Sequence, residues 1–489
     1  MMTESSLLVP HMISLQCHAG IRNLEANNTA LVNANNAMNR FINETRLAGR
    51  GYDALKQQIQ DYRLISDAKR EANDSDIWDF GALRTAVGDG SDLCGGHILS
   101  GIRQAEADEL RNRGHVINHE RAAEGYRLTG GTTCPHYLYH RRQRNNYESL
   151  RQGNINTKNA LTELKTRYET IEATTKWLFE RSDLLRNQIE SGFGVIAGAS
   201  TGLPDSYDSQ SLAAWRLRMQ ELRERLPFDQ ALDEIRVEHG DEAYEWVKES
   251  YDIAREMLNA WGFPVGDFDF DLLSEKLHDY QMIQEIKRVT EEQFPLSDWE
   301  ALTTLEERQI FLQEYMDAIL PIMGLENIGL RPISFDPTIG QANWNGFYNH
   351  SFNHELGIPA RTTWINPTTI DPNNEGWWFW QSSPKDSYES LQTLVHELRH
   401  AYQNVAADNI RATENAPNAP VVASVTADAW DHNRRNYLNT RTDRKTDERD
   451  TERYQEPGQT GNYTYKEYRN QPLEVDANGF ARNEVWNKV

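Results

Sequence analysis

The chain has 489 residues, of which 38% are hydrophobic and 26% are charged, and its formal net charge is -23. This length favours two or three domains, and the low apolar content favours exposed helices around modest cores. The charge disfavours nucleic acid and anionic membranes as partners, because both carry dense negative charge. The odd, sparse count of three cysteines disfavours a disulfide framework, and the absence of a C-x-x-C pair disfavours a cysteine zinc site.

The N-terminus does not have the features of a secretion leader. Residues 1–16 contain no Lys or Arg and no sustained apolar segment, which excludes a Sec-type signal peptide. The most apolar glycine-containing stretch, Gly192 to Ala199, is far too short to span a bilayer. We therefore expect no membrane span, and we expect any export of the chain to use a route without a cleaved leader.

Apolar residues recur at helical spacing in two segments near the N-terminus. The first segment contains Ile21, Leu24, Leu31, Met38 and Phe41. The second contains Tyr52, Leu55, Ile59, Tyr62 and Ile65. The two glycines of Leu47-Ala48-Gly49-Arg50-Gly51 lie between the segments and favour a break. These patterns predict an antiparallel hairpin of two amphipathic helices.

Three further features follow the predicted hairpin. Residues 89–133 are rich in Gly, His and charge, and they predict an irregular segment. Apolar residues at near-heptad spacing between 161 and 189 predict one long helix that ends at Gly192-Phe193-Gly194. Small residues, Gly and Pro between 197 and 204 predict a linker.

The sequence pattern changes in the C-terminal half. Residues 209–325 have a mostly helical pattern with a break at 261–264. Short β-rich stretches follow at 361–365 and 377–380, and Pro, Asn and Gly separate them. Residues 387–403 then have the apolar spacing of an amphipathic helix.

Dense mixed charge predicts an exposed loop at 439–456. The patterns divide the chain into a helical domain at 1–196, a linker and middle helical region at 197–297, and a C-terminal domain at 298–489. The expected fold class is mainly α in the N-terminal half, with a long helical hairpin or coiled coil, and α+β in the C-terminal domain.

The predicted helix at 387–403 contains His396-Glu397-Leu398-Arg399-His400. Residues i and i+4 of a helix share a face, so His396 and His400 can direct two imidazoles at one metal ion. Glu397 can approach a metal-bound water and take its proton. The pattern predicts zinc bound by the two histidines, with Glu397 as general base. The alternative is a surface helix whose histidines bind no metal.

A catalytic zinc needs a third protein ligand. The metzincin continuation requires Gly and His at two positions where this chain has Gln403 and Ala406, so that class is excluded. A downstream glutamate on a second helix is the remaining common solution, and Glu474 fits it. Asp476 and His432 are the alternative third ligands.

The segment around Glu474 predicts a helix that packs closely on another helix. Pro472 suits a first helical turn. Ala477 and Ala481 share a face with Glu474, and their small side chains permit a close approach. Asn478, one turn after Glu474, is predicted to hydrogen-bond a ligand histidine from outside the metal's coordination shell.

At these residues the C-terminal part, roughly Asp298 to Val489, resembles gluzincin-type metallopeptidases. In that group H-E-x-x-H is followed by E-x-x-A-[D/N] on another helix, and Glu474-x-x-Ala477-Asn478 matches this second motif. The resemblance implies a zincin-like α+β fold, Glu397 as the base, and three zinc ligands: His396, His400 and Glu474.

The N-terminal part, roughly Leu7 to Ile196, looks like the LXG domain of secreted polymorphic toxins. The matching residues are Leu47-Ala48-Gly49 at the predicted turn and then Gly51-Tyr52-Asp53-Ala54-Leu55-Lys56. The resemblance implies type VII secretion without a cleaved signal peptide, small helical secretion partners, and a toxic C-terminal domain with an immunity protein. An unrelated helical scaffold is the alternative.

The predicted function is a secreted toxin that hydrolyses a protein or peptide substrate with a zinc-activated water. Tyr465, Tyr468 and His432 are candidates to stabilise the oxyanion. Residues 361–365 are expected to be the edge strand that aligns the peptide, and the alternative is an ordinary core strand. Two alternatives are an interaction protein with a structural zinc site and an intracellular regulatory metallopeptidase. A fourth protein ligand to zinc would favour the first alternative, whereas the presence of Glu397 disfavours it.

Overall fold

The computed structural model describes residues 2–88, 90, 92–200, 207–338, 346–350, 359–372, 389–409, 421–435 and 471–484. These residues are mostly helical, and they form two compact units, Met1–Asp241 and Glu242–Val489. Among the described residues, no helix combines the length and the apolar character that crossing a membrane requires.

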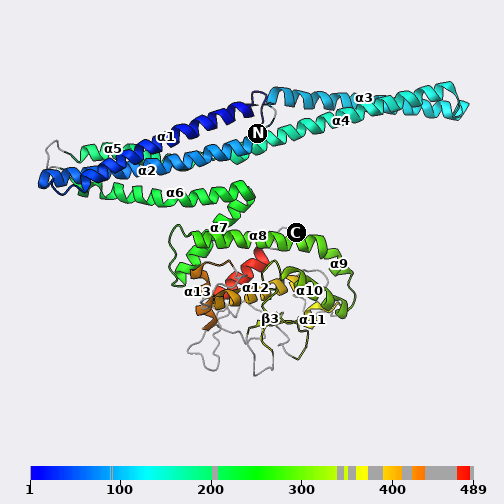
Figure 1. The fold of residues 1–489 in the computed structure, drawn as a ribbon. Helices are drawn as coiled ribbons and strands as arrows, with labels where there is room; N and C mark the ends of the chain where they lie inside the picture. Colours follow the sequence, from blue (N-terminus) through cyan, green and yellow to red (C-terminus); the bar gives the residue numbers. More distant parts are fainter. Residues whose placement is uncertain are drawn as a thin grey trace, which may run out of the picture. The chain divides into compact units, whose positions relative to one another are not determined.

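The first unit begins with the predicted hairpin. Helix α1 (Pro10–Ile42) lies beside helix α2 (Arg50–Val87), and the turn between them contains Leu47-Ala48-Gly49 (Figure 1). Gly49 has a φ of 110°, which only glycine adopts without strain. The apolar stripe predicted for α1 is half-buried at each position: Ile21, Leu24, Leu31, Met38 and Phe41. The hairpin prediction is confirmed, with both helices longer than expected.

A second helical hairpin occupies the segment that was expected to be irregular. Helix α3 (Gly95–Gly130) packs along helix α4 (Pro135–Thr175) (Figure 1). A short antiparallel ribbon of β1 (Leu7–Leu8) and β2 (Leu93–Cys94) precedes α3. The prediction for 89–133 was wrong because α3 has a sparse apolar stripe, spaced seven or eleven residues apart: Ile98, Ala105, Val116 and Ala123.

The single long helix predicted between 161 and 189 is two helices. Helix α4 ends at Thr175, and α5 (Glu180–Gly198) begins after Phe179, which has a left-handed φ of 72°. The backbone N–H of Phe179 donates to Asp79 Oδ2 at 2.9 Å, and its ring packs edge-on against Phe80. These tertiary contacts stabilise a backbone conformation that the local sequence does not favour.

Helix α5 also continues through the glycines at which it was predicted to end. A Cβ on Gly192 would lie 2.5 Å from the ring of Trp215, so this glycine permits a close helix–helix approach. Trp215 belongs to α6 (Ala213–His239), which follows the short 3₁₀ helix η1 (Ser209–Leu212). Helices α2, α5 and α6 share one core, in which Ile196 is fully buried. The first unit therefore extends past the boundary expected at 196.

The second unit opens with helices that the sequence indicated. Helix α7 (Asp241–Ala260) ends at the predicted break, and α8 (Phe270–Gln293), α9 (Leu296–Ala301) and α10 (Leu305–Ile319) follow it. The core of this unit includes Ile286 from α8 together with residues of α10 and of the later helices. Helix α8 is therefore part of the C-terminal unit, although the boundary expected at 297 excluded it.

A small sheet lies beside these helices. Strand β3 (Gly346–Asn349) pairs antiparallel with β4 (Thr362–Ile365), with Phe347 opposite Trp364. On the other side of β4, Ser334 N donates to Thr363 O at 2.9 Å and its carbonyl accepts from Ile365 N. The strand predicted at 361–365 is confirmed, but β4 lies between two neighbours, so the prediction that it is an edge strand was wrong. The outer edge of β3 pairs with no strand in the described part of the chain.

The remaining elements form the surroundings of the H-E-x-x-H helix. After the short α11 (Pro367–Ile370) come α12 (Glu389–Asn409) and α13 (Ser424–Arg435). Then α15 (Pro472–Asn478) continues into the π-helical η3 (Gly479–Glu484). Helix α12 contacts both strands as well as α13, α15 and η3. The β-rich stretch expected at 377–380 and the charged loop expected at 439–456 lie outside the described residues.

Candidate metal centre

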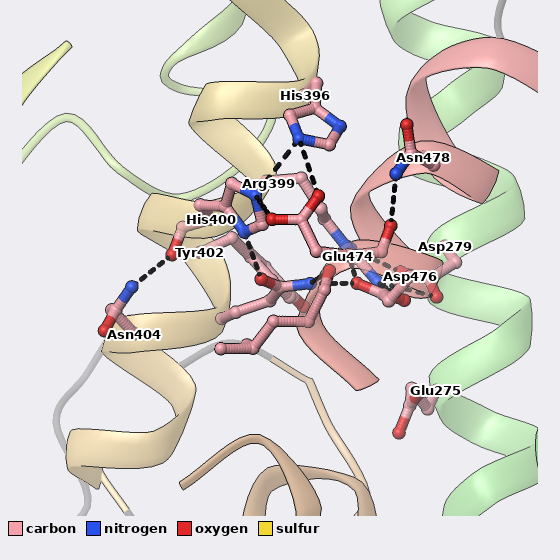
Figure 2. Close-up of polar contacts among 12 residues, drawn as sticks. Glu275, Asp279, His396, Arg399, His400, Tyr402, Asn404, Glu474, Asp476 and Asn478 are labelled. Carbon is pink, nitrogen blue, oxygen red and sulfur yellow. Dashed lines mark hydrogen bonds and ion pairs between the residues drawn. The ribbon is translucent and has the colours of Figure 1, made fainter. Parts of the chain in front are cut away.

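The apolar side chains of helix α12 pack into the core, and this packing determines the direction in which its two histidines point. Five apolar side chains of this helix have no exposed surface: Leu391, Leu394, Val395, Leu398 and Ala401. His396 and His400 are half-buried and lie one turn apart on the remaining face. Their Nε2 atoms are 3.1 Å apart, so both imidazoles point at one place (Figure 2).

Helix α15 brings Glu474 to the same place. Ala477 and Ala481 are fully buried, which allows this segment to approach α12 closely. Glu474 Oε1 lies 3.5 Å from His400 Nε2, and Oε2 lies 3.7 Å from His396 Nε2 (Figure 2). Ligands about 2.0–2.1 Å from a tetrahedral zinc ion are themselves about 3.3–3.4 Å apart. The three side chains therefore have the spacing of a zinc-binding triangle.

The electrostatics of the site favour a positive charge between these side chains. Glu474 is only 4% exposed. Burial lowers the pKa of His400, but Glu474 and Glu397 outweigh it and raise this pKa to about 9. A proton or a metal cation can supply the charge that the carboxylates favour. Two imidazoles and one carboxylate are a ligand set that suits zinc, whereas calcium and magnesium prefer oxygen ligands only.

Glu397 lies beside the two imidazoles. One carboxylate oxygen of Glu397 and one ring nitrogen of each histidine all lie within 4.8 Å of one another. Burial raises the pKa of Glu397 to about 7, and the nearby Glu474 adds to this effect. His400 and a hydrogen bond from the backbone N–H of Tyr348 act in the opposite direction. Tyr348 is in β3, so the carboxylate of Glu397 lies between the candidate metal position and the edge strand.

A glutamine that the sequence reasoning missed supports His400. Gln403 Oε1 lies 2.8 Å from His400 Nδ1. Asn478 was predicted for such a role, but its side-chain amide donates to the backbone carbonyl of Glu474 at 2.7 Å instead. Asn478 thus stabilises its own helix. The sequence signal for Gln403 was its position three residues after His400, which places both side chains on one face of α12.

The two alternatives to Glu474 lie elsewhere. Asp476 Oδ2 lies 2.7 Å from Arg399 Nε and belongs to a buried ion pair. His432 is exposed on α13, and its ring lies edge-on to Phe263 with the centroids 5.7 Å apart. Tyr465 and Tyr468, the other candidates for oxyanion stabilisation, lie outside the described residues.

A buried charge network lies directly behind the site. Arg399 is fully buried, and its guanidinium bonds Asp279 of α8 in a bidentate contact at 2.8 and 3.0 Å (Figure 2). Burial raises the pKa of Asp476, but Arg399 outweighs burial and holds this pKa below its ordinary value. The guanidinium also lies over the rings of Tyr402 and Phe480. One arginine inside the H-E-x-x-H motif therefore joins α8, α12 and α15.

A search for relatives finds no significant match among protein-family models, curated proteins or solved structures. Function is therefore inferred from the side chains of the site and their geometry.

Proposed function

We propose that residues 242–489 form a zinc-dependent metallopeptidase of the gluzincin type, with a zincin-like α+β arrangement around α12. The observation that supports this most is the triangle of His396, His400 and Glu474 with a buried carboxylate beside it. Zinc bound there would lower the pKa of a water and polarise a peptide carbonyl. Glu397 would accept the proton of that water and transfer it to the leaving amine.

The edge of β3 supports a peptide as the substrate. An extended peptide can add to an exposed strand edge through main-chain hydrogen bonds. The backbone N–H of Tyr348 in β3 contacts Glu397, so a peptide along this edge would pass next to the proposed base. Strand β3 therefore takes the aligning role that the sequence had suggested for residues 361–365.

The catalytic assignment is tested by Glu397→Gln. The amide cannot accept a proton, so peptide hydrolysis should fall by about two to four orders of magnitude, the usual contribution of a general base. Zinc content, measured by atomic spectrometry, should not change, because the proposed ligands remain. Glu285→Gln makes the same change at a half-exposed position of α8, far along the sequence from the candidate site, and should keep full activity. Hydrolysis by Glu397→Gln at the wild-type rate would contradict the proposal.

The rival with a structural zinc site is less well supported. In the part of the chain that the structure describes, the candidate ligand cluster includes Glu397 and no cysteine or aspartate. A closed structural site uses four protein ligands, and it has no use for a buried carboxylate with a raised pKa. An intracellular regulatory peptidase stays an alternative, and detection of the uncleaved protein in culture medium would exclude it.

We further propose that the first unit delivers the peptidase as a secreted toxin through a type VII-like system. The α1–α2 hairpin, with Leu47-Ala48-Gly49 in its turn, supports this proposal. The proposal implies small helical secretion partners and an immunity protein.

Substitutions in the apolar stripe of α1 test whether this helix directs export. Leu31→Asp combined with Met38→Asp places two charges on the half-buried stripe of α1 and should abolish export. Zinc binding by the second unit should continue. The matched pair Val32→Asp and Ala37→Asp changes exposed positions of the same helix and should leave export normal. Export of the protein is assayed by immunoblot of the medium. Normal export of the variant with Leu31→Asp and Met38→Asp would exclude α1 as the targeting element.

A further inference from the structure

Gln403 occupies a position from which it can control the candidate metal site. Its side chain has no exposed surface, although glutamine is usually exposed in proteins. Its amide contacts three groups on two helices: His400 Nδ1 at 2.8 Å, the carbonyl oxygen of Leu473 at 2.9 Å and Asp476 Oδ2 at 2.7 Å. Every polar atom of this buried amide therefore has a partner.

The partners determine which way the amide of Gln403 points. The carbonyl oxygen of Leu473 can only accept a hydrogen bond, and Asp476 Oδ2 already accepts one from Arg399 Nε at 2.7 Å. The end of the amide that faces them must be the NH₂ group. The opposite end is the oxygen, which can only accept a hydrogen bond from His400 Nδ1.

This orientation fixes the tautomer of His400. Nδ1 carries the hydrogen, so in the neutral ring the unprotonated nitrogen is Nε2. Nε2 is the atom that faces His396 and Glu474, at 3.1 and 3.5 Å. An amide on the far side of the ring thus presents the metal-binding nitrogen of His400 to the site.

The same amide also connects His400 to the third proposed ligand. Leu473 and Asp476 flank Glu474 in α15, and both accept from Gln403 Nε2. A displacement of α15 relative to α12 would break these bonds. Because Asp476 is in turn bound to the buried Arg399, Gln403 belongs to a chain of contacts that extends to Asp279 on α8.

We propose that Gln403 is the positioning residue of this site: it holds His400 in the Nδ1–H tautomer and keeps its Nε2 in register with Glu474. The inference rests on the proposed function, because it assumes that a metal ion binds there. Loss of such an outer contact typically weakens metal binding or activity about 10- to 100-fold.

Zinc dissociation constants of the full-length chain test the proposal, measured by competition with a chromogenic chelator. Gln403→Met keeps the volume but removes the acceptor, and it should bind zinc about 10- to 100-fold more weakly. The visible spectrum of bound cobalt should shift in Gln403→Met and stay close to wild type in the control variant Asn404→Ala.

Asn404→Ala is the matched control. This variant removes a neighbouring buried amide that bonds the backbone carbonyl of His400 and does not touch its ring. It should bind zinc as wild type does. If circular dichroism shows that Gln403→Met is unfolded, Gln403→Ala replaces it, because the smaller side chain leaves room for water to bind the freed polar groups.

The outcomes separate the two proposals. Wild-type zinc affinity in a folded Gln403→Met or Gln403→Ala variant would overturn the positioning role alone, and so would an unshifted cobalt spectrum in Gln403→Met. A wild-type protein that binds zinc but hydrolyses no peptide would remove the proposed function without affecting the role of Gln403. A wild-type protein that binds no zinc would overturn both.

Discussion

At the residue scale, two carboxylates only two positions apart have different environments. Glu474 faces two imidazoles, whereas Asp476 faces the guanidinium of Arg399. A regular helix turns by about 200° over two residues, so both side chains cannot reach the same point. Their separation follows from helical geometry: only Glu474 lies beside the two imidazoles, and only Asp476 lies beside the guanidinium.

This difference in environment predicts that two isosteric substitutions affect different quantities, one zinc affinity and the other stability. Glu474→Gln weakens a proposed direct ligand of the zinc ion. Zinc affinity should therefore fall by more than roughly 100-fold, the upper end of the loss that follows removal of a residue hydrogen-bonded to a ligand. Asp476→Asn leaves the buried Arg399 with one carboxylate, Asp279, and should lower the free energy of unfolding by about 3 kcal/mol. Chelator competition and urea denaturation measure the two quantities. Equal effects of both variants on zinc affinity would show that the roles are not separate.

At the element scale, the α3–α4 hairpin has an unusual seam of histidine and tyrosine. His119 Nδ1 lies 2.9 Å from His140 Nδ1, and the ring of Tyr147 stacks on both His115 and His119. Tyr126, two turns after His119 on α3, stacks on His140. These rings are less apolar than an ordinary helix–helix core, so their protonation should affect the pairing of the two helices.

The seam predicts that the hairpin loosens in mild acid. Burial, His140 and His115 together lower the pKa of His119 below its ordinary value of 6.5. The unfolded hairpin therefore binds more protons than the folded one, so stability is fully present above about pH 6.5 and declines as pH falls below that value. Hydrogen exchange of α3 and α4, corrected for intrinsic rates, should show more opening at pH 5 than at pH 7.5.

His119→Gln should reduce this pH dependence, because glutamine keeps a polar side chain that does not titrate. His18→Gln makes the same change at an exposed position of α1 and should leave the pH dependence of the hairpin unaltered. A hairpin that exchanges equally at both pH values in the wild type would contradict the prediction.

At the scale of the whole molecule, the division after Asp241 assigns α7 and α8 to the unit with the candidate metal site. Four residues of α8 lie in the core of that unit: Met282, Ile283, Ile286 and Val289. Asp279 on the same helix binds Arg399 of the H-E-x-x-H motif. Helix α8 is therefore part of what positions α12, although it lies more than a hundred residues earlier in the sequence.

Two fragments test this division. A fragment of residues 242–489 should unfold cooperatively and bind zinc as the full chain does, because it retains the whole core. A fragment of residues 298–489 lacks α8, so Arg399 loses Asp279 and the core loses several buried side chains. It should be unfolded or aggregated by circular dichroism and light scattering. A well-folded 298–489 fragment with wild-type zinc affinity would contradict the assignment of α8.

The sequence determined the local features by itself. Apolar spacing predicted the α1–α2 hairpin and α12, because one helix face repeats every three to four residues. The same spacing placed His396 and His400 on one face, since i and i+4 side chains are neighbours in any helix. The candidate Glu474 came from a matching second motif, and the structure places its carboxylate within 3.7 Å of both imidazole Nε2 atoms.

Only the tertiary structure decided features that depend on contacts between distant segments. Gly192 looked like a helix end, but it lies within α5. The residue is a glycine because the ring of Trp215 occupies the space that a side chain would need. Residues 361–365 looked like an edge strand, but Ser334 pairs with their second side. The partner of His400 is Gln403 and not Asn478, because Leu473 and Asp476 orient the glutamine amide. Local sequence fixes which way a side chain leaves its helix, whereas its partner depends on what the folded chain brings opposite it.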